Sequence, residues 1–354
     1  MNETAQYVLS VMFRASWQAA FLAAIVLLTT WFLRDRIPAR VRYVLWCVVL
    51  MRLLFIVVPQ SNLSIFALLR HDTEPVETLA MMEPMQFDAS GVPALDDSAV
   101  HNMLRSGEPP EATGPIRPWL EAIVIVLGIV WGAGVVYLLF RQFRLEMQMF
   151  RSIRQWSDNQ DSELQQMLDQ CRREVGLWWK VRLMITSDEV GAASTGILRP
   201  TVLLGRRLID SMTREELRLV MLHELRHLLR FDPLFHRIAG LMTIVHWPNP
   251  AAWLVAERLR QERELAVDSA VIRHADGRGG AAYARAILTA SELYSLKRPL
   301  SGLIGVFGKN SFLQRRIEMI VTKKKVSRFW TAFAVVALLL LVGTGLTDAG
   351  NGRE

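Results

Sequence analysis

Four long apolar stretches constrain this chain of 354 residues more than any other feature of its sequence. They cover residues 15–33, 43–59, 118–140 and 329–346, and the first of them contains no charged residue. Nineteen helical residues, the length of the first stretch, rise about 28 Å, which is close to the ~30 Å hydrocarbon core of a bilayer. Four buried helices of a soluble protein are the alternative, but the basic residues beside these stretches favour membrane crossing. We therefore expect four transmembrane helices, with the lipid bilayer as a partner.

Basic residues mark one side of the predicted membrane. They gather in the short loop at 34–42, after the third stretch and before the fourth. Because positively charged loops stay in the cytoplasm, this pattern predicts a cytoplasmic segment at 141–328. The N-terminus, the loop at 61–117 and the tail at 347–354 then lie outside a bacterial cell membrane. Since the net charge of +7 is explained by topology, we expect no direct contact with nucleic acid.

The loop at 61–117 differs in composition from the rest of the chain. It contains nine acidic and three basic residues and is rich in proline. Such a composition is typical of a poorly ordered segment. A small ligand-sensing element is the alternative, because long loops that persist are often functional.

The cytoplasmic segment carries a metal-binding motif on a predicted helix. A capping box at 213–216 begins a helix over 214–230. Inside it, His223 and His227 are four residues apart and lie on one face, where two imidazoles can bind one Zn²⁺. Glu224 lies beside that face and could take a proton from water, as the general base of a hydrolase does. This HExxH motif also arises by chance, so its helical context is what favours a metal site.

A catalytic zinc site needs a third protein ligand. A second helix, predicted over 253–272, carries several carboxylates. Glu264 and Asp268 share one face of it, so that Glu264 could bind the metal and Asp268 could orient a histidine from behind. Spacing alone leaves two alternatives open: Glu262 is a rival ligand, and the whole helix could be an ordinary solvated, charged helix.

A series of short motifs follows HExxH in order along the chain. They are HELRH at 223–227, Arg230 and Asp232, HWPNP at 246–250 and RQERELAVD at 260–268. Together they resemble the transmembrane zinc metallopeptidases of the beta-lactam sensor-transducers, which act as antirepressors. The likeness covers residues 8 to about 346, which is nearly the whole chain.

This resemblance implies a fold and a set of site residues. It implies a membrane protein that is mainly α, with a cytoplasmic zincin-like α+β domain of the gluzincin type beside the four transmembrane helices. Zinc is then held by the two histidines of HExxH and by Glu264, which the resemblance favours over Glu262. It further implies that Glu224 is the general base and that Asp268 supports a metal ligand.

The resemblance also implies a role in signalling. We expect a zinc metalloendopeptidase that cleaves a cytoplasmic repressor, with a winged-helix repressor as the candidate substrate and a homodimer as a candidate assembly. The drug-sensing members carry a large extracellular penicillin-binding domain after the last span, whereas eight residues follow Leu346 here. Without a Ser-x-x-Lys nucleophile in the exported segments, we do not expect acylation by beta-lactams. A housekeeping membrane protease and a non-catalytic receptor or scaffold are the alternatives.

Three further features are candidates for function. His246 could stabilise an oxyanion, but a structural residue that packs a helix end is the favoured interpretation. Arg315 lies between the protease segment and the last apolar stretch, where a juxtamembrane basic patch is the first interpretation and autoproteolysis the second. A short predicted strand is the candidate edge along which an extended substrate binds. This strand consists of Thr201, Val202, Leu203 and Leu204.

Overall fold

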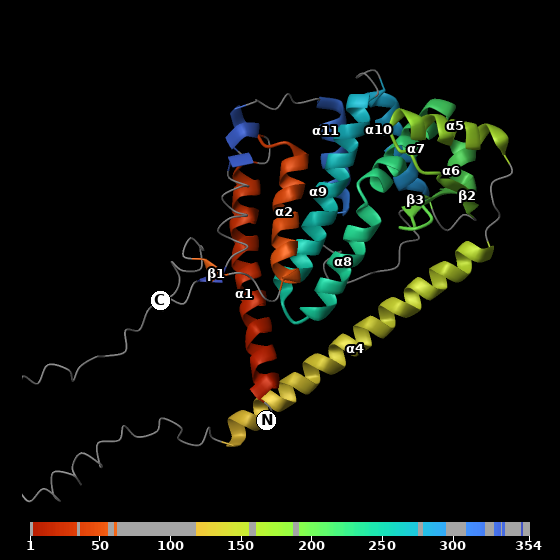
Figure 1. The fold of residues 1–354 in the computed structure, drawn as a ribbon. Coiled ribbons are helices and arrows are strands. Elements are labelled where there is room, and N and C mark those ends of the chain that lie inside the picture. The colour runs from red at the N-terminus through yellow and green to blue at the C-terminus, as the bar shows by residue number, and fades with distance from the viewer. Residues whose placement is uncertain are drawn as a thin grey trace, which may run out of the picture.

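The computed structural model is mainly helical in the residues that it describes (Figure 1). The residues outside its description are 1–2, 34–35, 56–59, 62–117, 156–160, 187–190, 275–278, 295–308, 323–328, 334, 337–347 and 350–354. The helices are α1 (Glu3–Phe32), α2 (Ala39–Leu54), α4 (Pro118–Gln155), α5 (Ser162–Glu174), α6 (Arg206–Ser211), α7 (Arg214–Leu229), α8 (Asp232–Val245), α9 (Pro250–His274), α10 (Gly280–Tyr294) and α11 (Lys309–Thr322). The strands are β1 (Gln60–Ser61), β2 (Arg182–Thr186), β3 (Ala192–Thr195), β4 (Thr201–Gly205) and β5 (Asp348–Ala349).

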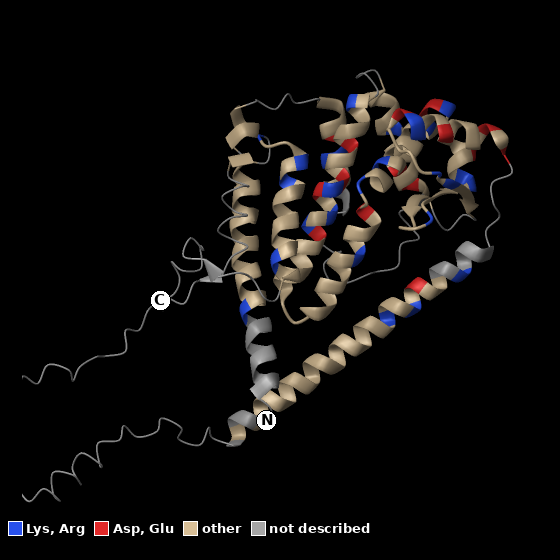
Figure 2. Ribbon diagram, viewed as in Figure 1, with Lys and Arg blue, Asp and Glu red and all other residues tan. Residues whose placement is uncertain are grey.

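Among the residues that the structure describes, two helices are long and apolar enough to cross a membrane. They are α1, over Arg14–Phe32, and α4, over Ala122–Gln148. In α4 the apolar side chains lie on the outside of the protein, and its charges gather towards its C-terminal end (Figure 2). An apolar surface of this length is unfavourable in water and suits contact with lipid. These two helices coincide with the first and third predicted spans, although α4 continues as one helix well beyond residue 140.

The second predicted span differs from the structure in its bounds. α2 contains 16 residues and rises about 24 Å, which is short for a membrane crossing. It begins immediately after Pro38. Proline has a fixed φ angle and no backbone N–H, so it is common at the start of a helix and disfavoured inside one. As a result, Arg40 and Arg42 belong to the first turn of α2 and not to the loop. The fourth predicted span, 329–346, lies mostly outside the described residues.

A small three-stranded sheet and the helix that carries HExxH form one hydrophobic core. β4 is the central strand, with β2 parallel on one side and β3 antiparallel on the other. The structure therefore corrects the expectation that Thr201–Leu204 forms a sheet edge. The reason is that both edges of β4 are paired with neighbouring strands. Its side chains are also buried on both faces, as in the interior strand of a covered sheet. α7 packs against β3 and β4.

The predicted capping box at the start of α7 is confirmed. The backbone N–H of Thr213 donates to the Glu216 carboxylate at 2.9 Å, and the Glu216 N–H donates to the Thr213 hydroxyl at 3.3 Å. These two bonds satisfy N–H groups that the first helical turn leaves without partners. The helix that carries the histidines therefore begins at a fixed position.

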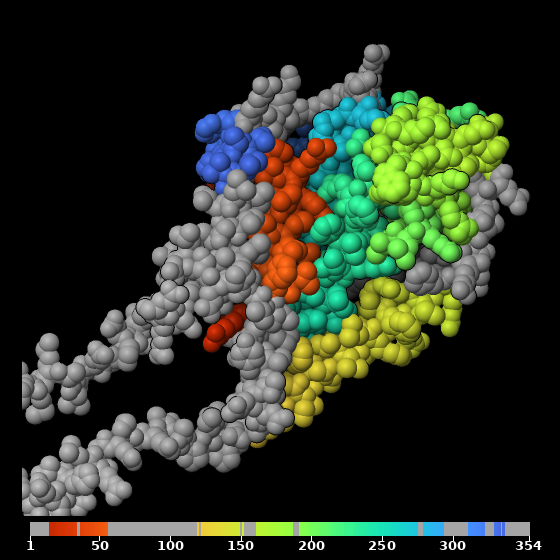
Figure 3. All heavy atoms as spheres, in the orientation of Figure 1, coloured from red at the N-terminus to blue at the C-terminus, as the bar shows by residue number. Residues whose placement is uncertain are grey.

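The helices α8 and α9 form an antiparallel hairpin that lies beside the apolar helices and not apart from them (Figure 1). At the turn of this hairpin, the Asn249 amide donates to the Ser16 hydroxyl of α1 at 2.6 Å. The Trp247 indole N–H donates to the Trp131 carbonyl of α4 at 3.2 Å. In Figure 3, α4 lies along the edge of the folded part of the chain. Residue 141 is the predicted boundary between the third span and the cytoplasmic segment. In the structure, residues on the two sides of this boundary pack against one another.

The contact between α4 and the hairpin gives a first prediction. A methyl group on Gly134 would lie 2.6 Å from the Trp247 indole, whereas one on Gly132 would meet nothing within 4 Å. We expect Gly134→Ala to lower the thermal stability of the detergent-solubilised protein relative to Gly132→Ala, since overpacking costs about 1–3 kcal/mol. Both substitutions gain the same helix propensity, so equal melting temperatures for the two variants would contradict the packing of α4 on this turn.

Candidate metal centre

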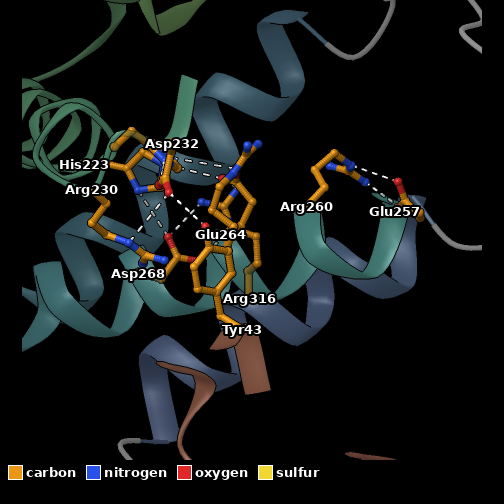
Figure 4. A network of polar contacts seen from close by, with 11 residues as sticks. Tyr43, His223, Arg230, Asp232, Glu257, Arg260, Glu264, Asp268 and Arg316 are labelled. Atoms are coloured by element: carbon orange, nitrogen blue, oxygen red, sulfur yellow. Dashed lines mark hydrogen bonds and ion pairs between the residues drawn. The ribbon is translucent and has the colours of Figure 1, made fainter. Parts of the chain in front are cut away.

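Two helices bring three ligand atoms together. α7 supplies His223 and His227, and α9 supplies Glu264, with all three ligand atoms within 4.8 Å of one another. The Nε2 atoms of the two histidines are 3.1 Å apart. The Glu264 carboxylate lies 3.5 Å from Nε2 of His223 and 3.8 Å from Nε2 of His227. Figure 4 shows the polar network around them.

This arrangement fits a zinc ion. Tetrahedral Zn²⁺ binds nitrogen and oxygen at about 2.0–2.2 Å, which separates its ligand atoms by about 3.4 Å. The two Nε2 atoms are 3.1 Å apart, and the two oxygens of Glu264 lie 3.5 Å from one and 3.8 Å from the other, so these separations are close to that value. Three protein ligands also leave one tetrahedral position for water or substrate, as in catalytic zinc sites. The donor set of two imidazoles and one carboxylate is one that Zn²⁺ accepts.

Asp232 fixes the orientation of His227. Its Oδ2 atom accepts a hydrogen bond from Nδ1 of His227 at 2.7 Å, which leaves Nε2 free to bind a metal. The chain reaches this position because Phe231 adopts a left-handed backbone conformation, with φ 55° and ψ 29°, between α7 and α8. Such a conformation is uncommon for a large residue and turns the chain sharply. In the sequence, Asp232 is one of the residues that carry the resemblance, but the sequence alone predicts no role for it.

A tyrosine and a carboxylate hold His223 in the same way. Nδ1 of His223 lies 2.7 Å from the hydroxyl oxygen of Tyr283, and that hydroxyl donates to Oδ1 of Asp268 at 2.6 Å. Asp268 also lies 3.4 Å from Nδ1 of His223. The structure therefore places Asp268 behind the first histidine, where the sequence expectation had it. Tyr283, on α10, was missed because nothing in its sequence neighbourhood relates it to the motif.

Arg316 of α11 balances the charge of Asp268. Its guanidinium makes two hydrogen bonds to the carboxylate, at 2.7 and 2.8 Å, and reaches Glu264 at 3.7 Å. Its neighbour Arg315 reaches Glu262 at 3.4 Å. The structure therefore corrects the interpretation of Arg315 as part of a juxtamembrane patch, because both arginines pair with carboxylates of α9. Their role was hidden because the pairing spans about fifty residues of sequence.

The electrostatics of the pocket favour positive charge. Burial alone would lower the pKa of His223, but hydrogen bonds to Asp268 and Glu264 outweigh it and raise that pKa to about 9. Burial would raise the pKa of Asp268, but Arg316 outweighs it and holds that pKa at about 2. The ionised carboxylates therefore attract a cation to the histidines, and a metal ion can take the place of a proton there.

Glu224 and Glu262 lie in different positions relative to the three ligand atoms. Glu224 is buried on α7, next to His223 in the chain. Glu262 lies in a buried ion pair with Arg42 of α2, at 2.8 Å, and does not join the group of ligand atoms. The rival to Glu264 therefore has a structural partner of its own.

His246 does not belong to the metal centre. It caps the C-terminal end of α8, a helix of 14 residues that rises about 21 Å from Asp232. There its Nε2 atom lies 3.3 Å from the Leu53 carbonyl of α2. The structure thus agrees with the favoured interpretation, a residue that packs a helix end, and does not support the oxyanion role.

A zinc-binding motif with a third ligand from a second helix, set beside apolar helices, is typical of a membrane metallopeptidase. The chain belongs to the M56 peptidase family, since the family profile described as BlaR1 peptidase M56 matches residues 10–320. The family inferred from the motifs is confirmed. It is a family of membrane-associated peptidases, in agreement with the two apolar helices.

Two curated relatives show how far the likeness extends. Regulatory protein BlaR1 of Bacillus licheniformis is 26% identical over 217 residues, which are 60% of this chain and 35% of that protein. Methicillin resistance mecR1 protein of Staphylococcus aureus strain Mu50 is 21% identical over 233 residues, which are 64% of this chain and 40% of that protein. The chain thus matches well under half of the length of these relatives.

The pairing of Arg316 gives a second prediction. Its partner Asp268 is fully buried, so Arg316→Gln leaves an uncompensated carboxylate in the core. We expect this variant to lose about 3–5 kcal/mol of unfolding free energy, measured by denaturant titration in detergent. The control is Arg285→Gln, which removes an ion pair to Glu216 from a side chain that is 72% exposed and should cost less than about 1 kcal/mol. Equal losses in the two variants would contradict the role given to Arg316.

Proposed function

We propose that this protein is a zinc metalloendopeptidase embedded in a bacterial cell membrane, and that it transduces a signal by cleaving a cytoplasmic repressor. The single observation that carries the proposal is the group formed by His223, His227 and Glu264, whose ligand atoms lie within 4.8 Å of one another. Membership of the M56 family supports peptidase chemistry at this group. The proposed arrangement keeps the metal centre in the cytoplasm and both termini outside.

The chain's own residues divide the chemistry of peptide hydrolysis. Zn²⁺, when bound, lowers the pKa of water towards about 7 and polarises a carbonyl group. Glu224 accepts the proton of the attacking water and returns it to the leaving nitrogen. Asp232 and Tyr283 hold the two imidazoles so that their Nε2 atoms face the same point. Exclusion of bulk water strengthens each of these interactions.

The substrate backbone is proposed to lie along β3. Among the described residues, β3 pairs with β4 on one edge only, and its residues are partly exposed. β3 also packs against α7, which carries the histidines. An extended peptide can add to such an edge through backbone hydrogen bonds. This replaces β4 as the candidate strand.

A small hollow follows the end of β3, with several apolar side chains around it. It is formed by the turn between β3 and β4 and by the connection between α7 and α8. Its lining includes Trp179, Ile197, Pro200, Leu228, Phe231 and Leu234. We propose that these apolar side chains contact a peptide bound along β3, while its backbone makes the hydrogen bonds.

The proposed partner is a transcriptional repressor, and a winged-helix repressor is the candidate. This rests on the resemblance to the antirepressor metallopeptidases, and the relatives are a regulatory protein and a methicillin resistance protein. A homodimer is the proposed assembly. A housekeeping protease would instead cleave many unrelated proteins, and a non-catalytic receptor would keep its function without Glu224.

The general base gives a third prediction. Glu224→Gln should lower the rate of repressor cleavage by about 10²–10⁴-fold, because the amide cannot accept a proton. Its zinc content should stay unchanged, since Glu224 is not among the ligand atoms. The matched control is Glu215→Gln, an exposed position in the first turn of the same helix. Both quantities are measured on purified protein with a candidate repressor and with unrelated proteins as substrates.

The outcomes of this experiment separate the three functions. Cleavage of the repressor alone, lost in Glu224→Gln, supports the signalling protease. Cleavage of every substrate at similar rates would favour the housekeeping protease. No cleavage of any substrate by wild type, together with normal signalling by Glu224→Gln in cells, would favour the non-catalytic receptor.

A further inference from the structure

The start of α2 contacts the residues that orient the metal ligands. Tyr43, which is 8% exposed, lies with its hydroxyl oxygen 3.5 Å from Oδ1 of Asp232. The other oxygen of the same carboxylate accepts the hydrogen bond from Nδ1 of His227. One carboxylate therefore joins a side chain of α2 to a metal ligand of α7. Figure 4 labels Tyr43 and Asp232 in this network.

Arg230 forms the second contact between Tyr43 and this carboxylate. Its guanidinium carbon lies 4.5 Å from the centre of the Tyr43 ring, within the range of a cation–π interaction. Its Nε atom lies 3.7 Å from Oδ1 of Asp232. Tyr43 thus contacts Asp232 through its hydroxyl group and the Arg230 guanidinium through its ring. Since Asp232 is only 2% exposed, water contributes little to the position of its carboxylate.

A buried ion pair fixes α2 against α9 one residue earlier. Nε of Arg42 lies 2.8 Å from Oε2 of Glu262, and the two side chains are 7% and 5% exposed. Arg42 also donates to the Ile37 carbonyl at 2.7 Å. Because these contacts set the position of α2 along α9, they also set where the Tyr43 hydroxyl lies relative to Asp232.

We propose that Tyr43 is a positioning residue for the metal centre, and that it acts on His227 through Asp232. This inference rests on the proposed metal site. With its hydroxyl 3.5 Å from Oδ1, Tyr43 favours the orientation of the carboxylate in which Oδ2 accepts from His227. The affinity of the centre for metal then depends on the position of α2, which packs against the apolar helix α1. A displacement of α2 would therefore change the position of Asp232 and, through it, of the ligand His227.

Tyr43→Phe separates this role from simple packing. Phenylalanine keeps the ring, its volume and its contact with Arg230, and removes only the hydroxyl group. A residue that merely fills space would leave the metal affinity unchanged after this substitution. If Tyr43 acts through Asp232, the substitution would lower the metal affinity, but only while Asp232 keeps its negative charge.

The experiment is a double-mutant cycle on the full chain in detergent. The proteins are wild type, Tyr43→Phe, Asp232→Asn and the double variant, with Tyr137→Phe as a control at an exposed position of α4. Zinc affinity is measured by competition with a chelator, and the visible absorption of the Co²⁺-loaded proteins reports the ligand geometry. We expect Asp232→Asn to weaken zinc binding by about 10–100-fold, the usual effect of losing an outer-shell partner. Tyr43→Phe should weaken it by about three- to tenfold and shift the Co²⁺ spectrum.

The double variant decides the inference. We expect it to bind zinc as Asp232→Asn does, because Tyr43 acts through that carboxylate. Wild-type affinity and an unshifted Co²⁺ spectrum in Tyr43→Phe would overturn the inference. An equal loss in the presence and absence of the Asp232 charge would also overturn it. If wild type itself binds no zinc, the proposed function fails first, and the inference fails with it.

Discussion

The structure depends on the balance of charge in a region that is nearly closed to water. Four carboxylates in this region are less than a tenth exposed: Glu224, Asp232, Glu262 and Asp268. A buried carboxylate without a partner costs several kcal/mol. Arginines from α2, from the connection between α7 and α8 and from α11 face three of them. The negative charge of Glu264 meets the two histidines, and a divalent cation between them would complete the balance.

This requirement explains why the metal centre and the apolar helices form one unit. The partners of the buried carboxylates come from segments far apart in the chain: Arg42 from α2 and Arg316 from α11. The hairpin of α8 and α9 carries Asp232 and Glu264 at the metal centre, while its turn contacts Ser16 of α1 and Trp131 of α4. A change among the apolar helices can therefore reach the metal ligands through direct contacts, without a flexible linker.

Local patterns predicted the parts of the site that depend on neighbouring residues. The capping box and the spacing of the histidines place HExxH on α7, and the spacing of Glu264 and Asp268 places both carboxylates on one face of α9. Contacts between distant segments left no local signal, so Tyr283 and Arg316 were missed, and two interpretations of His246 stayed open. β4 was mistaken for an edge because a short apolar strand fits an interior and an edge position equally well. The length of α2 and the contacts of the α8–α9 hairpin with α1 and α4 also depend on packing between distant segments. The hydropathy pattern gives no information about such packing.

The central claim is that Glu264, together with the two histidines of α7, holds zinc. The most direct test is the zinc content of the purified protein by mass spectrometry, for wild type, Glu264→Gln and Glu262→Gln. The two positions lie on the same helix, but only Glu264 has its carboxylate within reach of both histidines. We predict about one zinc per chain in wild type and in Glu262→Gln, and a marked loss in Glu264→Gln, since a neutral amide is a poor zinc ligand. Equal zinc content in the two variants, or no zinc in wild type, would contradict this claim.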